Sequence, residues 1–213
     1  MRGTLALLFG MCLPLMPDSL MADSGILPAP TFDIPFDDVD PAMTQAAVRQ
    51  QIATFLETLD THWGASQEVI RTSVTGTLER EDGGALIYTR TLADHSVVEG
   101  YDFRGGSLVR GQYVFLQRPV NGLNEFIDYY DAVKQSLTAL HGPPVEDRTI
   151  WDNDLYQPLP DYWGVAVQIG HLRYAAMWET PEGIITIELT GNHHSRLMIE
   201  YRSRKFVEDS QTA

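Results

Sequence analysis

The spacing of apolar residues along this chain changes from a helical period to a strand period, and it does so twice. Between residues 41 and 63, apolar side chains recur every three or four positions, which places them on one stripe of a helix. From 85 to 117, β-branched and aromatic residues dominate in short runs separated by turn residues. A second helical stripe covers 124–140, and strand-like runs return over 146–203. The pattern predicts an α+β protein with a largely antiparallel sheet and two main amphipathic helices.

Local signals mark where these elements begin and end. Asp40 and Pro41 suit the start of the first helix, because Asp caps free amides and Pro fits the first helical position. Ser66 is placed to cap a second, shorter helix. The later helix should stop at Gly142–Pro144, and residues 180–183, TPEG, predict a hairpin.

The strand-like runs fall into two groups, each preceded by a helix. The first group predicts a meander of about three strands, ALIYTRTL, HSVVEGYDF and SLVRGQYVFLQ. The second is EDRTIW, then a loop or short helix over 152–170, then HLRYAAMWE, GIITIELT and SRLMIEYRS. We therefore expect one domain over 41–206, built of similar halves at 41–118 and 119–206. The similarity is one of layout, so duplication and chance alternation of elements both remain open.

The first 22 residues have the layout of a signal peptide. Arg2 supplies a positive n-region, an apolar core follows it, and Ala22 is a suitable cleavage residue. The apolar core is too short to span a bilayer. We expect export, with residues 23–40 as a Pro-rich, acidic lead-in and residues 207–213 as a tail.

Composition narrows the class of protein further. The chain has 213 residues, a formal charge of -14 and 44% hydrophobic residues, which argues against both a disordered chain and a nucleic-acid-binding protein. Its single cysteine, Cys12, lies inside the apolar core of the signal, and Gly10 and Met11 before it do not fit a lipid-anchor site. A mature chain without thiols suits the periplasm or the extracellular space. No later segment is apolar enough to be transmembrane.

Catalytic and nucleotide-binding motifs are missing from the sequence. It contains neither the G-x-S-x-G nucleophile motif nor the G-x-x-x-x-G-K-[ST] and G-x-G-x-x-G phosphate-binding motifs. The sequence therefore leans away from an enzyme without settling the question. It predicts no cofactor and no catalytic residues.

His193 and His194 form the densest imidazole cluster and are the strongest metal-binding candidates. Glu188, Asp154 or His171 would have to approach them after folding, because a metal site needs three or four converging ligands. Neighbouring residues on a strand point to opposite faces, so the pair also suits a polar hairpin tip. The tip is the favoured interpretation, and no metal site is predicted.

An acidic and aromatic segment, residues 151–163, is the strongest candidate for acid–base chemistry. Its carboxylates are Asp152, Asp154 and Asp161, and paired carboxyls beside aromatic rings are typical of sugar-cleaving sites. The alternative is a solvated loop whose aromatic residues anchor it to the sheet. The aromatic residues of the segment are Trp151, Tyr156, Tyr162 and Trp163.

Five large aromatic residues fall within the predicted strands. Most should lie in the core, and any on a sheet face without helices would contribute to a concave surface for a partner. These residues are Tyr101, Tyr113, Trp151, Trp178 and Tyr201.

Short motifs in both halves resemble a family of small exported bacterial modules. WGASQEVI (Trp63–Ile70) and the meander ending in LVRGQYVF resemble the G-M-S/T-x-x-E-V opening and strand layout of the β-lactamase-inhibitor-protein-like fold and of SmpA/OmlA-type outer-membrane assembly proteins. In the second half, HGPPVED places Gly142 and Pro143 like the L-G-x-P of these modules, with Trp151 after it. Residues 101–203 are also similar to uncharacterised exported bacterial proteins. The resemblance implies a binding or scaffolding module and assigns no functional residue.

These observations together predict a non-catalytic exported protein, periplasmic or secreted, that binds a protein or envelope component through its sheet or loops. The alternative is a hydrolase or carbohydrate-active enzyme that uses the segment 151–163. Neither the partner nor the oligomeric state follows from the sequence.

Overall fold

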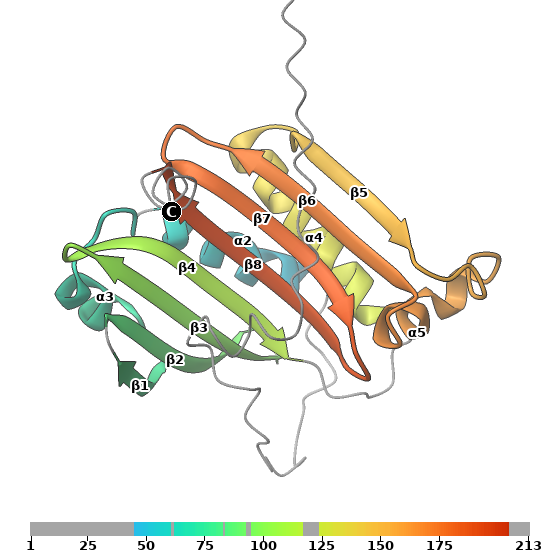
Figure 1. Cartoon of the computed structure of the whole chain (residues 1–213), viewed down its shortest axis with the longest axis horizontal. Coiled ribbons are helices and arrows are strands. Elements are labelled where there is room, and N and C mark those ends of the chain that lie inside the picture. Colours follow the sequence, from blue (N-terminus) through green and yellow to red (C-terminus); the bar gives the residue numbers. More distant parts are fainter. Residues whose placement is uncertain (1–44, 61, 83, 93–94, 117–123, 205–213) are drawn as a thin grey trace, which may run out of the picture. The chain divides into compact units, whose positions relative to one another are not determined.

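A single antiparallel sheet organises the computed structural model, which describes residues 45–60, 62–82, 84–92, 95–116 and 124–204. Its eight strands lie in the order β1-β2-β3-β4-β8-β7-β6-β5 (Figure 1). Each half of the chain supplies four consecutive strands, and the last strand of each half, β4 or β8, lies at the centre. The α+β class and the antiparallel sheet predicted from the sequence are confirmed.

The first half contributes two helices and then a meander. Its elements are α2 (Gln45–Asp60), α3 (Gln67–Ser73), β1 (Thr77–Asp82), β2 (Ala85–Leu92), β3 (His95–Arg104) and β4 (Ser107–Leu116). The second half begins with one helix and then forms four strands, with a short helical insertion after the first of them. Its elements are α4 (Glu125–His141), β5 (Glu146–Trp151), a 3-10 turn (Pro160–Tyr162), α5 (Trp163–Gln168), β6 (Leu172–Glu179), β7 (Gly183–Gly191) and β8 (Ser195–Ser203).

The helices α2 and α4 both lie behind the sheet in Figure 1 and cover one of its faces. Alternate residues of each central strand point toward these helices and are buried, as the period of two in a β-strand requires. In β8 the apolar residues on this face are Leu197, Ile199 and Tyr201, and they meet Ile52, Phe55 and Leu56 of α2 in one hydrophobic core. The other face of the sheet is therefore left without a described helix.

Caps and turns end the elements close to where the sequence places them. The Ser66 hydroxyl accepts a hydrogen bond from the Val69 amide at 3.4 Å, which caps α3. Gly142 ends α4 with φ 82° and ψ -171°, a conformation that favours glycine. Thr180 and Gly183 close the β6–β7 hairpin, where the Thr180 amide donates to the Gly183 carbonyl at 2.8 Å.

Several boundaries differ from the prediction. The first helix ends at Asp60 instead of 63, and Gly64 turns the chain after it with φ 70°. The first meander has four strands, because the charged segment TLERED forms β1 at the edge of the sheet. Its side chains are mostly exposed, so it lacks the apolar alternation by which strands are recognised.

Some predictions fall on residues outside the described part of the chain. These are the signal peptide at 1–22, the lead-in at 23–40, the helix start at Asp40 and Pro41, and the tail at 207–213. Among the described helices, none has both the length and the apolar content needed to cross a membrane.

The predicted preference of the strand aromatics for the core is confirmed. Tyr101, Tyr113, Trp178 and Tyr201 lie on the helix-covered face and are at most 2% exposed. Trp151 is half-buried and packs against the edge of the core. These side chains therefore do not line the open face of the sheet.

Candidate functional site

Two features of the described residues stand out as candidate sites, and the first is the face of the sheet without a described helix. Its side chains form rows that run across the strands. One row joins Val98, Val114 and Met198, which lie next to each other on β3, β4 and β8. The next row holds Gln112 and Glu200, also directly paired. The face therefore has an apolar strip beside a charged cluster near its centre.

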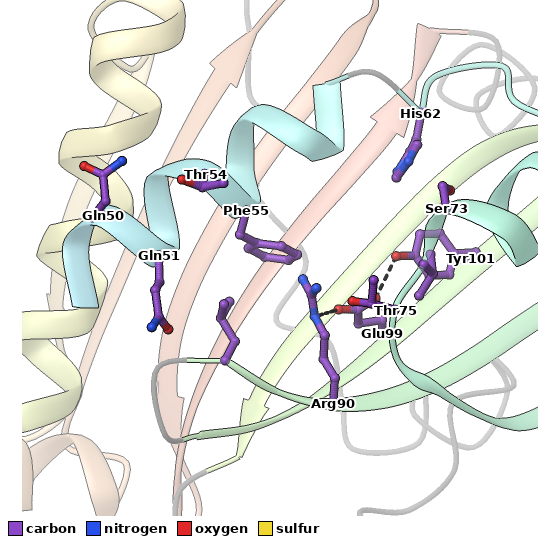
Figure 2. Close-up of a pocket in the computed structure, with 12 residues that line it drawn as sticks. Gln50, Gln51, Thr54, Phe55, His62, Ser73, Thr75, Arg90, Glu99 and Tyr101 are labelled. Atoms are coloured by element: carbon purple, nitrogen blue, oxygen red, sulfur yellow. Dashed lines mark hydrogen bonds and ion pairs between the residues drawn. The ribbon is translucent and has the colours of Figure 1, made fainter. Parts of the chain in front are cut away.

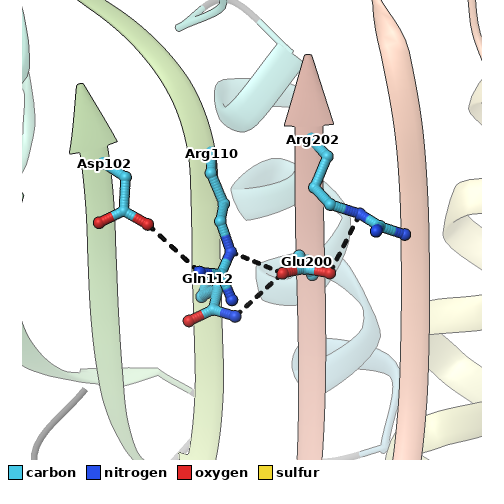
Figure 3. Close-up of polar contacts among 5 residues, drawn as sticks. All are labelled: Asp102, Arg110, Gln112, Glu200 and Arg202. Atoms are coloured by element: carbon cyan, nitrogen blue, oxygen red, sulfur yellow. Dashed lines mark hydrogen bonds and ion pairs between the residues drawn. The ribbon is translucent and has the colours of Figure 1, made fainter. Parts of the chain in front are cut away.

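Glu200 is the hub of the charged cluster (Figure 3). Only 4% of it is exposed, and one of its carboxylate oxygens accepts from Arg110 Nε at 2.7 Å and from Gln112 Nε2 at 3.0 Å. Its other oxygen lies 3.2 Å from Arg202 Nε. Arg110 also reaches Asp102 at 3.4 Å, so one chain of ion pairs spans three strands. Three side chains thus contact Glu200, which joins Arg110 and Arg202 in one network.

Further ion pairs extend the charged surface toward the β5 edge. Arg148 lies 2.8 Å from Glu146, and Arg173 binds both oxygens of Asp152 at 2.7 and 3.1 Å. Burial raises the pKa of Glu188 on β7, although the charge of Arg196 opposes this effect. This face carries many of the arginines of an acidic chain, and its charges are largely balanced.

The second feature is a cavity of about 340 Å³ on the other side of the sheet (Figure 2). It opens between α2, the segment after α3, and the strands β2 and β3. Phe55, Val74 and Leu92 give it apolar walls. Polar side chains make up the rest of the lining and are Gln50, Gln51, Thr54, His62, Ser73, Thr75, Arg90, Glu99 and Tyr101.

A buried carboxylate lies at the floor of this cavity. Glu99 is 1% exposed, forms an ion pair with Arg90 and accepts a hydrogen bond from the Tyr101 hydroxyl at 2.8 Å. Burial raises the pKa of Glu99, and the charge of Arg90 only partly opposes this effect. The Arg90 guanidinium lies over the Phe55 ring, with Cζ 4.5 Å from the ring centroid. Glu99 and the Phe55 ring therefore both restrain the Arg90 guanidinium.

His62 lies at the opposite end of the cavity lining. It is 7% exposed, and its Nδ1 has no hydrogen-bond partner among the described residues. Burial lowers the pKa of His62, which favours the neutral imidazole at neutral pH. An unsatisfied buried nitrogen costs stability unless a ligand or water satisfies it.

The structure places the acidic residues of the segment 151–163 at the surface. Asp152, Asp154 and Asp161 are exposed, and Asp152 is bound to Arg173. Trp151 and Trp163 pack edge to face with ring centroids 5.8 Å apart, and together with Tyr156 they border the core. Tyr162 is exposed, so the geometry matches a solvated loop anchored by three of its four aromatic residues.

His193 and His194 are exposed at the tip of the β7–β8 hairpin, where His193 has φ 64°. The His193 carbonyl accepts from Gln168 Nε2 at 3.1 Å. In the described part of the chain, no three His, Cys, Asp or Glu side chains gather as metal ligands.

Sequence reasoning missed the residues of the cavity. A signal was present for Glu99, because in HSVVEGYDF it shares a strand face with Val97 and Tyr101, where a core residue is expected. Arg90 occupies a similar place in β2. No sequence signal distinguishes His62, whose burial depends on how the segment after α2 packs.

Comparison with known proteins found no protein-family model, no curated protein and no solved structure that matches the chain. The resemblance to small exported modules therefore stays a prediction. Function is inferred below from the contacts of the chain's own residues.

Proposed function

We propose that this chain is an exported, non-catalytic binding protein that holds a protein or envelope component against the face of its sheet opposite α2 and α4. The observation that carries this proposal is the apolar strip of Val98, Val114 and Met198 beside the ion pairs around Glu200. An apolar centre with a polar surround is typical of protein interfaces. Export rests on the signal peptide predicted at 1–22 and places the protein in the periplasm or outside the cell.

Preorganisation supports the same proposal. The ion pairs of Arg110, Arg202 and Glu200 are already formed, so a partner would not have to order these long side chains on binding. The overall charge of -14 would repel an acidic partner, whereas the balanced charges of this face would not. A partner with a mixed apolar and charged surface fits both conditions.

Site-specific photo-crosslinking tests the proposal. A benzoylphenylalanine at Thr186, which neighbours Glu200 across β7 and β8, should give a discrete adduct in envelope extracts. The same probe at Gln135, exposed on α4, is the matched control and should give none. The proposal also predicts that Thr186→Arg lowers capture of the adduct partner at least about tenfold, whereas Gln135→Arg leaves it unchanged. Equal labelling at both positions, or none at Thr186, would contradict it.

The alternative hydrolase at 151–163 keeps a direct test. Asp154→Asn should abolish turnover of a defined glycoside without unfolding the chain if that segment is catalytic. Unchanged turnover would remove the segment from consideration.

A further inference from the structure

The two halves of the sheet differ in what they bury beneath the helices. On the helix-covered face of β6 and β7, the buried side chains include Trp178, Ile185, Ile187 and Leu189. The corresponding strands of the first half, β2 and β3, place Glu99 there, together with Arg90. Buried ion pairs are weak sources of stability, because removing two charges from water costs about as much as their attraction returns. Stability of the fold therefore does not explain why this ion pair is buried, whereas binding of a ligand would explain it.

The ion pair with Glu99 uses only part of the Arg90 guanidinium. Arg90 makes this ion pair through Nε, and its two terminal nitrogens point toward Phe55 and the cavity in Figure 2. A guanidinium presents its N–H groups in a planar fork that matches the two oxygens of a carboxylate. The ion pair of Nε with Glu99 and the Phe55 ring 4.5 Å from Cζ together restrain the guanidinium.

The remaining lining restricts the shape of a ligand. Phe55, Val74 and Leu92 offer apolar contact, and the unpartnered Nδ1 of His62 offers one polar contact away from Arg90. A volume of about 340 Å³ equals that of roughly ten water molecules, at the lower end of small-molecule pockets. A ligand of this size has a single ring or a short branched chain.

We propose that the cavity binds a small organic carboxylate, whose two oxygens accept hydrogen bonds from the terminal nitrogens of Arg90 and whose apolar body contacts Phe55, Val74 and Leu92. The site lies on the other side of the sheet from the face opposite α2 and α4. It can therefore succeed or fail independently of the partner proposed for that face.

Paired probes of equal shape provide the test. Benzoate and cyclohexanecarboxylate are titrated into the protein and followed by amide NMR, with benzamide and cyclohexanecarboxamide as uncharged controls. The carboxylates should bind with a Kd on the order of 1 mM or tighter and shift the amides of β2, β3 and α2. The amides should bind at least about tenfold more weakly, because they lack the charge that Arg90 recognises.

Arg90→Lys is the informative variant. It keeps a positive charge beside Glu99, and with it the fold, but removes the planar fork, so carboxylate affinity should fall at least about tenfold. Arg148→Lys, on the exposed edge strand β5, is the matched control and should leave affinity unchanged. A second variant, His62→Phe, leaves Arg90 and Glu99 unchanged, fills part of the cavity with apolar bulk and should also weaken binding.

Each result of the binding experiment either supports or contradicts the proposal. Preferential binding of the carboxylates that is lost in Arg90→Lys supports the proposal. Equal binding of carboxylates and amides, shifts confined to other parts of the sheet, or no binding by about 10 mM ligand would overturn it.

Discussion

Strands β2 and β3 occupy the same place in the first half of the sheet as β6 and β7 do in the second, yet the two pairs bury different chemistry. Beneath α4 the core contains Trp178, Ile185 and Ile187, each 1% exposed. Beneath α2 it contains Glu99, equally buried, and the cavity beside it. The same strand layout occurs in this chain once with a buried ion pair and once with an apolar core. The layout itself therefore does not require the ion pair. It is better explained by what the cavity binds.

The physical cost of burying a carboxylate in the first half is reflected in the raised pKa of Glu99. Its pKa is raised by burial even though Arg90 pairs with it, so the attraction of Arg90 does not fully offset the loss of solvent. On the helix-covered face of β6 and β7, the buried residues Trp178, Ile185, Ile187 and Leu189 include no carboxylate and carry no such cost. We therefore expect the second half to resist perturbation by packing alone and the first half to depend on charge.

The largest loss of stability should come from a substitution in the second half, whose core beneath α4 is apolar. Trp178→Ala removes a ring that is 1% exposed and the hydrogen bond from its Nε1 to the Gly142 carbonyl at 3.0 Å. The free energy of unfolding should fall by about 4 kcal/mol, measured by urea denaturation. A loss below about 1 kcal/mol would mean that this half does not hold the sheet to α4 as described.

The next largest loss of stability should come from removing Arg90, one partner of the buried ion pair with Glu99. Arg90→Met leaves the Glu99 carboxylate buried without its positive partner, so the free energy of unfolding should fall by about 3 kcal/mol at neutral pH. Arg148→Met serves as the control, because Arg148 is an exposed arginine whose loss should cost less than about 1 kcal/mol. Similar losses in the two variants would contradict a special role for the buried pair.

The glycines that follow α2 and α4 give a second comparison of the two halves, with smaller expected losses of stability. Gly142 combines φ 82° with ψ -171°, a region open essentially to glycine alone, whereas Gly64 has φ 70°. An added Cβ meets nothing within 4 Å at either position, so backbone strain alone sets the cost. We expect Gly142→Ala to lower the unfolding free energy by about 2 kcal/mol and Gly64→Ala by about 1 kcal/mol. The reverse order would show that packing dominates.

The smallest expected effect is a dependence on pH. Because the pKa of Glu99 in the folded protein lies above its usual value of 4.5, the folded state holds this proton more tightly than the unfolded state. The contribution of Glu99 to stability should therefore fall as the pH rises from about 4.5 through the raised pKa. Comparing the wild-type protein with a variant that lacks both Arg90 and Glu99 isolates this effect. A stability difference that does not change with pH would argue against the burial cost.

Much of the fold was predictable because apolar periodicity reports directly on burial. The stripes of α2 and α4, and the alternation in β8, where Leu197 and Ile199 are buried, follow this rule. Apolar periodicity did not predict the edge strand β1, because its exposed and charged residues show no apolar alternation. The order of strands, with β4 beside β8, is a long-range pairing that periodicity does not specify.

The candidate sites were less predictable for the same physical reason. Patterns along the chain drew attention to Asp152, Asp154 and the pair His193–His194, which the structure leaves at the surface. Glu99 and His62 acquire their properties only when distant segments bury them. A charged residue at a core position of a strand, as Glu99 is within HSVVEGYDF, was the one available signal.

The most direct test replaces the polar pair of the first half with the apolar chemistry of the second. The double variant Arg90→Met, Glu99→Leu is compared with the wild-type protein by urea denaturation at neutral pH. If the pair is kept for binding and not for folding, the double variant should be as stable as wild type or more stable by about 1–3 kcal/mol, although Arg90→Met alone is damaging. A loss of about 3 kcal/mol or more in the double variant would show that the fold itself depends on the pair, and would contradict the account.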